Sequence, residues 1–185
     1  MPDQKRYSGI GSREAPPAIL RLMTHIASFM ESQGYILCSG GANGSDSAFE
    51  EGVTDPEMKN IFIPWKGFNR STSLLYSITA EAYTMAEKFH PSWKGLSDPV
   101  KNIMARNCYQ VLGLSLDKPV DMVVCYTPHG KAEGGTGQAL RIASYYSVPI
   151  FNLYYTKDID KILSWIKDGK ISLIKKLEIE SWKLI

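Results

Sequence analysis

Glycine is concentrated in three segments of this 185-residue chain, and each segment comes after a short apolar run, the third one after an intervening polar loop. The segments are residues 9–13 (GIGSR), 39–46 (SGGANGSD) and 133–138 (EGGTGQ). Glycine lets the backbone adopt positive φ and approach a ligand closely, because no Cβ stands in the way. A helix that begins at such a turn points unpaired N–H groups and its positive dipole end at an anion. Together, the three turns predict a phosphate-binding site.

The residues predicted to contact this phosphate lie in the three turns and on one further helix. They are Gly11, Ser12, Arg13, Ser39, Gly40, Gly41, Gly44, Asn107, Gly134, Gly135, Thr136, Gly137 and Gln138. Two common phosphate motifs are incomplete, since the first turn does not finish G-x-G-x-x-G and the third lacks the GK[ST] of a P-loop. Ordinary hydrolysis of a nucleoside triphosphate is therefore not expected.

Short apolar runs alternate with helical periods along the chain, and these elements must position the three turns. Strands are expected at 7–10, 35–38, 60–64, 120–126 and 148–153. Helices are expected at 16–33, 45–53, 79–89, 99–112, 136–146 and 158–167. Such alternation is typical of an α/β fold with a doubly wound parallel sheet, in one Rossmann-like domain. In that architecture ligands bind at the carboxyl ends of the strands, which is where the glycine turns fall.

The composition is that of an ordinary globular domain. Hydrophobic residues make up 44% of the chain, and 21 Lys and Arg against 19 Asp and Glu give a net charge of +2. That charge fits a small anionic ligand better than a long track on nucleic acid. No stretch approaches the roughly 18 apolar residues of a membrane span, and the first residues show no secretory signal. We therefore expect a cytoplasmic protein without a membrane partner.

The three cysteines and the three histidines are widely spaced. There is no CxxC pair and no HxxxH pair, so the sequence predicts neither a metal site nor a disulfide framework. No redox cofactor or other cofactor is expected either.

Two sets of motifs resemble known families. Residues 11–13 (GSR) and 39–46 resemble the Rossmann domain of DNA-processing protein A. Residues 104–107 (MARN) and 134–137 (GGTG) resemble the Met-x-Arg-Lys segment and the Gly-Gly-x-Gly-Thr turn of the LONELY GUY phosphoribohydrolases, once called lysine decarboxylase-like proteins. Both families belong to the SLOG superfamily of Rossmann-like nucleotide-binding proteins. The resemblance covers about residues 6–153 and implies one SLOG-type domain over 1–185 that binds a nucleotide or nucleoside phosphate.

The phosphoribohydrolase resemblance implies cleavage of the N-glycosidic bond of a nucleoside monophosphate or a related nucleotide. A carboxylate assists that reaction by stabilising the oxocarbenium-like transition state or by activating water. The glutamate of that family falls at Arg141 here and its lysine at Asn107, so another carboxylate must act. Glu133 and Asp46 are the candidates. Arg106 is the third expected catalytic residue and would hold the phosphate, because a guanidinium binds phosphate bidentately.

Two alternatives to an N-glycosidase remain open, so whether the protein is an enzyme is also open. The arginine at 141 favours a non-catalytic module that senses a nucleotide. The GSR and SGGANGSD motifs favour a single-stranded DNA-binding protein like DNA-processing protein A.

Three further features concern organisation. Aromatic residues within 64–98 favour a lid or insertion over the ligand. Residues 171–185 form either a closing strand or an oligomer contact. Superfamily relatives often form dimers, so a homodimer is expected.

Overall fold

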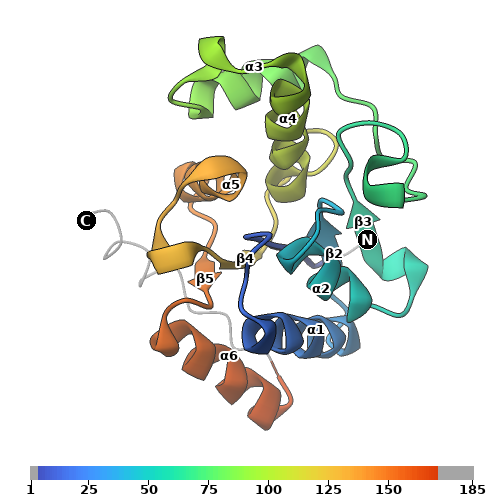
Figure 1. Cartoon of the computed structure of the whole chain (residues 1–185). Coiled ribbons are helices and arrows are strands. Elements are labelled where there is room, and N and C mark those ends of the chain that lie inside the picture. The colour runs from blue at the N-terminus through green and yellow to red at the C-terminus, as the bar shows by residue number, and fades with distance from the viewer. Residues whose placement is uncertain (1–3, 171–185) are drawn as a thin grey trace.

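The computed structural model describes residues 4–170, with a five-stranded parallel sheet through its middle (Figure 1). The strands are β1 (Arg6–Gly11), β2 (Ile36–Ser39), β3 (Lys59–Ile61), β4 (Met122–Tyr126) and β5 (Ile150–Asn152). Their order in the sheet is β3-β2-β1-β4-β5. The chain winds outward in both directions from the boundary between β1 and β4, which is the doubly wound topology. The expected Rossmann-like α/β fold is confirmed.

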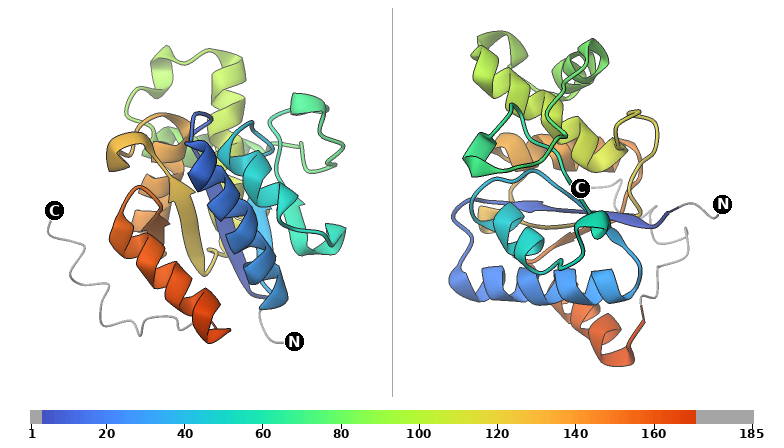
Figure 2. Two further views of the ribbon diagram at one scale, coloured as in Figure 1. Left: turned by 60° about the horizontal axis from the view of Figure 1, so that its bottom comes forward. Right: turned by 90° about the vertical axis from the view of Figure 1, so that its right-hand side faces the viewer.

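Within the described residues, α-helices cover both faces of this sheet. They are α1 (Pro17–Ser32), α2 (Ser45–Glu51), α3 (Ala80–Phe89), α4 (Asp98–Leu112), α5 (Gly134–Tyr145) and α6 (Thr156–Asp168). Helices α1 and α6 lie on one face, and α4 and α5 lie on the other (Figure 2). Helix α2 packs against α1, and α3 packs on the outer side of α4. None of the helices between residues 4 and 170 is long and apolar enough to cross a membrane.

Strand β4 lies inside the sheet, between β1 and β5, and its position accounts for its continuous apolar sequence. Met122 and Val124 lie in the hydrophobic core beneath α1 and α6, whereas Val123 and Cys125 lie in the core beneath α4 and α5. Successive side chains of a strand point to opposite faces. Because both faces are covered by helices, every position of the strand has to be apolar, and a continuous apolar run results.

The boundaries of some elements differ from the expected ones. The expected strand 60–64 ends at Ile61, because the N–H of Ile63 donates to the carbonyl of Leu75 (2.9 Å) and so leaves the sheet. Helix α5 begins at Gly134, two residues before the expected start. The predicted role of 171–185 lies outside the described residues.

The segment between β3 and α4 contains α3 and is fastened to α4 by side-chain hydrogen bonds. The hydroxyl of Tyr83 donates to Oδ1 of Asn102 (2.5 Å). The N–H of Thr79 donates to the hydroxyl oxygen of Tyr109 (2.9 Å). Helix α3 is thus held against the domain through α4, the helix that also carries Arg106.

Candidate functional site

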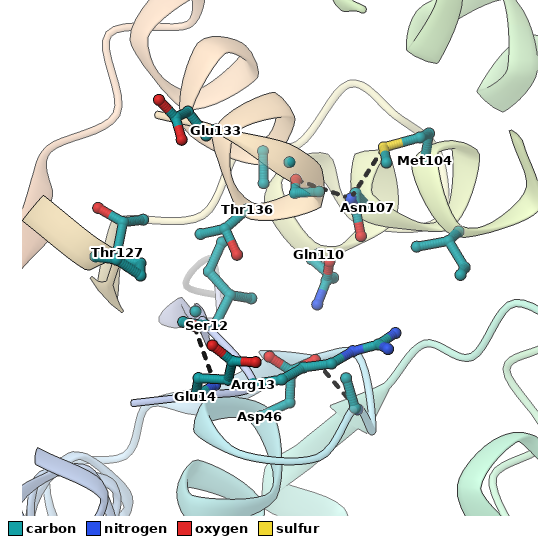
Figure 3. A pocket seen from close by; sticks show the side chains of 18 of the residues that line it. Ser12, Arg13, Glu14, Asp46, Met104, Asn107, Gln110, Thr127, Glu133 and Thr136 are labelled. Atoms are coloured by element: carbon teal, nitrogen blue, oxygen red, sulfur yellow. Dashed lines mark hydrogen bonds between the residues drawn. The ribbon is translucent and has the colours of Figure 1, made fainter. Parts of the chain in front are cut away.

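A cavity of about 530 Å³ opens at the carboxyl ends of β1 and β4, where the winding of the sheet reverses. Its walls come from the turns after these strands, from α4, and from the first turn of α5 (Figure 3). The predicted site residues that line it are Gly11, Ser12, Arg13, Asp46, Arg106, Asn107, Glu133, Gly134, Gly135 and Thr136. The fold therefore brings residues from all three glycine turns and from α4 to one place.

Asp46 and Arg106 form a buried ion pair in the cavity wall. Oδ2 of Asp46 lies 3.8 Å from Nη1 of Arg106, and their side chains are only 6% and 4% exposed. The N–H of Ala42 also donates to Oδ2 of Asp46 (3.3 Å). Burial raises the pKa of Asp46 to about 6 and lowers the pKa of Arg106 to about 10, and each charge partly offsets the shift of the other. Asp46 thus titrates much nearer neutral pH than an ordinary carboxyl.

Two buried donors in this wall have no hydrogen-bond partner among the described residues. They are Nε of Arg106 and Nε2 of Gln110, and both residues line the cavity. Figure 3 shows Gln110 and Asp46 reaching toward the same space from opposite sides. A buried donor without a partner costs about 1–3 kcal/mol, so an acceptor that reaches these two groups would be stabilised by them.

Gln110 was not among the predicted site residues. It lies one helical turn after Arg106 on α4. Residues four apart on a helix share one face, so this spacing is the signal that could have found it.

The first turn of α5 presents backbone donors to the cavity. Its N-cap residue, Glu133, makes no capping hydrogen bond with its side chain. The first N–H groups of a helix have no partner within the helix, and Gly134, Gly135 and Thr136 line the cavity. Asn107 holds this turn against α4, because its Nδ2 donates to the carbonyl of Gly135 (3.0 Å). Asn107 therefore positions the turn as well as lining the cavity.

Glu133 itself is at the outer rim. Its side chain is 77% exposed, and Oε1 lies 3.9 Å from Nζ of Lys131. Figure 3 shows its carboxylate turned away from Asp46. An exposed pair of this kind contributes little to stability, and it leaves Glu133 outside the buried part of the cavity.

Two glycines of the second turn do not line the cavity, and neighbouring groups occupy the space that a side chain would need there. A Cβ at Gly40 would overlap the guanidinium of Arg106. Gly44 has φ of 82°, and a Cβ there would lie 2.5 Å from the carbonyl oxygen of Arg13. These close approaches join the second turn to α4 and to the first turn.

The remaining predicted residues lie outside the cavity lining. The buried hydroxyl of Ser39 donates to the carbonyl of Gly9 (2.7 Å), and Nε2 of Gln138 donates to the carbonyl of Ala86 (3.2 Å). Gly137 packs against the backbone at Ala132, where a Cβ would not fit.

Gly41 lines a second hollow of about 510 Å³, together with residues 69–73. None of the residues 64–98 lines the first cavity. A lid over the ligand therefore stays a prediction.

Arg141, which the predicted resemblance aligns with the glutamate of the phosphoribohydrolases, donates hydrogen bonds to two backbone carbonyls. Its Nε donates to the carbonyl of Phe89 (2.8 Å), and its Nη1 donates to the carbonyl of Ala132 (3.2 Å). These bonds link α5 to the end of α3 and to the loop before α5. Arg141 does not line the cavity.

Neither a family model nor a curated protein matches the sequence significantly. In structure, the chain is similar to DNA-processing protein A from Helicobacter pylori, a protein described for its single-stranded DNA binding mode. The comparison gives a TM-score of 0.50 at 17% identity, and it covers 97% of this chain and 80% of the other. The likeness is one of fold.

The resemblance to DNA-processing protein A that the sequence predicted is therefore confirmed at the level of the Rossmann-like fold. The finer resemblances, to the LONELY GUY phosphoribohydrolases and to the SLOG superfamily, stay predictions. Between residues 4 and 170, no three His, Cys, Asp or Glu side chains are grouped so that they could hold a metal ion.

Proposed function

We propose that this protein binds a nucleotide in the cavity at the carboxyl ends of β1 and β4. The observation that carries the proposal is the pair of unpartnered buried donors, on Arg106 and Gln110, in a cavity that also receives the first turn of α5. A phosphate offers several acceptor oxygens and a negative charge. It would complement these donors, the N–H groups of the turn and the positive end of the helix.

The size and position of the cavity support this proposal. Sites for small ligands typically measure about 300–1,000 Å³, and the cavity of about 530 Å³ lies within that range. It lies at the switch in strand order, where open α/β sheets generally bind their ligands. Arg13, at its rim, adds a second guanidinium.

The positions of the two predicted catalytic carboxylates, Glu133 and Asp46, support binding rather than cleavage of the N-glycosidic bond. Glu133 is turned outward and lies beside Lys131. Asp46 lies against Arg106, and Arg141 replaces the glutamate of the phosphoribohydrolases. We therefore propose a binding protein, and cleavage remains a separate hypothesis that an assay of base release can test.

A second candidate function is binding of single-stranded nucleic acid, in which the cavity receives one nucleotide of the strand. The likeness in fold favours it, because it extends over 97% of the chain and the similar protein is described as binding single-stranded DNA. On this proposal the phosphate in the cavity is a diester of the strand rather than a monoester.

Isothermal titration calorimetry with ribo- and deoxyribonucleoside monophosphates and with short oligothymidylates tests both candidates. We expect Gln110→Leu, which keeps the volume but removes the amide, to weaken binding about tenfold. Gln33→Leu, at the end of α1, is the matched control and should bind normally. Failure of every nucleotide and oligonucleotide to bind would contradict the proposal. Affinity for oligonucleotides alone, falling steeply with salt, would favour the second candidate.

A further inference from the structure

Four aromatic side chains form a shelf beside the cavity. They are Tyr126, His129, Tyr154 and Tyr155. Tyr126 ends β4 and His129 follows it, whereas Tyr154 and Tyr155 follow β5. These two strands are parallel neighbours, as Figure 1 shows, so the shelf lies at the same edge of the sheet as the cavity. Tyr154 and Tyr155 are 44% and 41% exposed, so their rings are accessible to a ligand.

The rings of this shelf contact one another. The ring centre of Tyr154 lies 6.2 Å from that of His129, 6.5 Å from that of Tyr126 and 5.3 Å from that of Tyr155. The ring of Tyr155 lies over Gly130, where any Cβ would collide with it. The rings meet at interplanar angles of 55°, 66° and 84°, so the four residues form one aromatic cluster whose rings present both faces and edges.

A buried hydrogen-bond network fixes the loop that carries Tyr154. Oδ1 of Asn152 accepts from the N–H groups of Tyr154 (3.1 Å) and Thr127 (3.2 Å). Nδ2 of Asn152 donates to the hydroxyl of Thr127 (2.7 Å), and the N–H of Asn152 donates to Asp158 (2.9 Å). Exposed rings on a preorganised loop can bind a flat ligand without first paying the entropy of ordering themselves.

The shelf is continuous with the cavity, because His129 belongs to both. Cations lie at both ends of this surface. Lys131 lines the cavity, and Nζ of Lys157 lies 5.7 Å from the ring centre of Tyr155. Aromatic faces with cations beside them are the combination that binds single-stranded nucleic acid, where bases stack and phosphates lie near positive charge.

We propose that the shelf stacks the base of the nucleotide next to the one held in the cavity. The ligand is then at least a dinucleotide unit of a single-stranded nucleic acid, and Tyr154 is the central stacking residue. This inference rests on the proposed function, since the cavity supplies the first nucleotide. Stacking on an aromatic side chain changes the affinity for a strand by about ten- to a hundredfold per base.

The test compares thymidine monophosphate with the dinucleotide and the tetranucleotide of thymidine by calorimetry at one salt concentration. We expect the dinucleotide to bind at least about tenfold more tightly than the mononucleotide. Tyr154→Ala should abolish this gain while the mononucleotide affinity stays the same, and Tyr154→Phe should keep it. Tyr145→Ala is the matched control, because Tyr145 is a 60% exposed tyrosine at the far end of α5.

The possible failures are distinguishable. If the mononucleotide does not bind to the wild-type protein, the proposed function fails. If it binds but the dinucleotide gains nothing, or if Tyr154→Ala keeps the full gain, the shelf is not a stacking site. A change of oligomeric state in Tyr154→Ala, measured by light scattering, would overturn the proposal in favour of a contact between copies of this chain. Tyr154→Leu, which keeps apolar bulk but has no aromatic ring, replaces Tyr154→Ala in the test if the alanine variant does not fold.

Discussion

The guanidinium of Arg106 lies directly on the backbone of Gly40. A Cβ at Gly40 would come within 1.6 Å of Nη1 of Arg106 and 2.6 Å of Nε2 of Gln110. Position 40 must therefore be glycine if Arg106 and Gln110, the two donors on α4, are to keep their positions at the cavity. The contact also holds the guanidinium beside Asp46. The position of Arg106 thus depends on a residue that does not itself line the cavity.

Gly40→Ala should displace Arg106 and weaken nucleotide binding by at least about tenfold. The added methyl group overlaps the guanidinium, and overpacking of this kind costs roughly 1–3 kcal/mol of stability. Calorimetry with the best-binding nucleotide measures the first effect, and urea unfolding measures the second. Gly95→Ala is the matched control, because a Cβ at Gly95 meets nothing within 4 Å. Normal binding by Gly40→Ala would show that Arg106 does not hold the ligand.

The pH dependence of stability should carry a signature of Asp46. Its pKa in the folded protein is raised to about 6 by burial, above the usual value of about 3.9 that it has when unfolded. The folded state therefore binds this proton more tightly. The contribution of Asp46 to stability is fully present below about pH 4 and is lost as the pH rises through about 6.

The free energy of unfolding of the wild type, minus that of Asp46→Asn, isolates this contribution. It should fall by on the order of 3 kcal/mol between pH 4 and pH 7. Urea unfolding at several pH values measures it, with Glu133→Gln as the exposed-carboxyl control. A difference that rises with pH, or stays constant, would mean that Asp46 is not buried as described.

Binding of an anion should depend on the same proton. Above about pH 6 the carboxylate of Asp46 is charged, repels an anion in the cavity and draws the guanidinium of Arg106 to itself. A dinucleotide, whose phosphodiester keeps one charge throughout, should therefore bind several-fold more tightly at pH 5 than at pH 7.5. In Asp46→Asn this dependence should vanish. An equally steep dependence in that variant would assign it to another group.

The sequence predicted the order of the elements and the edge of the sheet where the cavity lies. Both follow from local signals. Continuous apolar runs mark strands covered on two faces, and glycine marks turns that approach other groups closely. The end of β3 at Ile61 was not predictable, because it depends on the hydrogen bond between Ile63 and Leu75, which the local pattern does not contain.

The site was predicted less completely than the fold. Which charges pair is decided by packing, and nothing in the spacing indicates that Asp46 meets Arg106. For the same reason Gly40 was expected to touch a ligand, whereas it touches Arg106. The shelf was missed for another reason. Tyr154 and Tyr155 follow a strand that is not succeeded by a glycine turn, whereas the predicted site rests on glycine turns.

Arg141 should be a structural residue. Arg141→Met removes its hydrogen bonds to the carbonyls of Phe89 and Ala132, and should lower the free energy of unfolding by about 1 kcal/mol. Nucleotide affinity should stay within about twofold of the wild type, because the residue does not line the cavity. Thermal unfolding and calorimetry measure the two effects. A large loss of affinity with unchanged stability would place Arg141 in the binding site after all.

The protein should bind and release nucleotides without cleaving them. Cleavage of the N-glycosidic bond needs a carboxylate at the anomeric carbon, and neither of the two predicted carboxylates, Glu133 and Asp46, is well placed for that role. Glu133 faces outward, and Asp46 lies against Arg106 in the wall. We expect no free base from ribo- or deoxyribonucleoside monophosphates after prolonged incubation, as measured by chromatography. The variant Arg141→Glu, which restores the glutamate of the phosphoribohydrolases, should release none either. Base release by the wild type that disappears in Asp46→Asn would instead identify a hydrolase with Asp46 as its catalytic carboxylate.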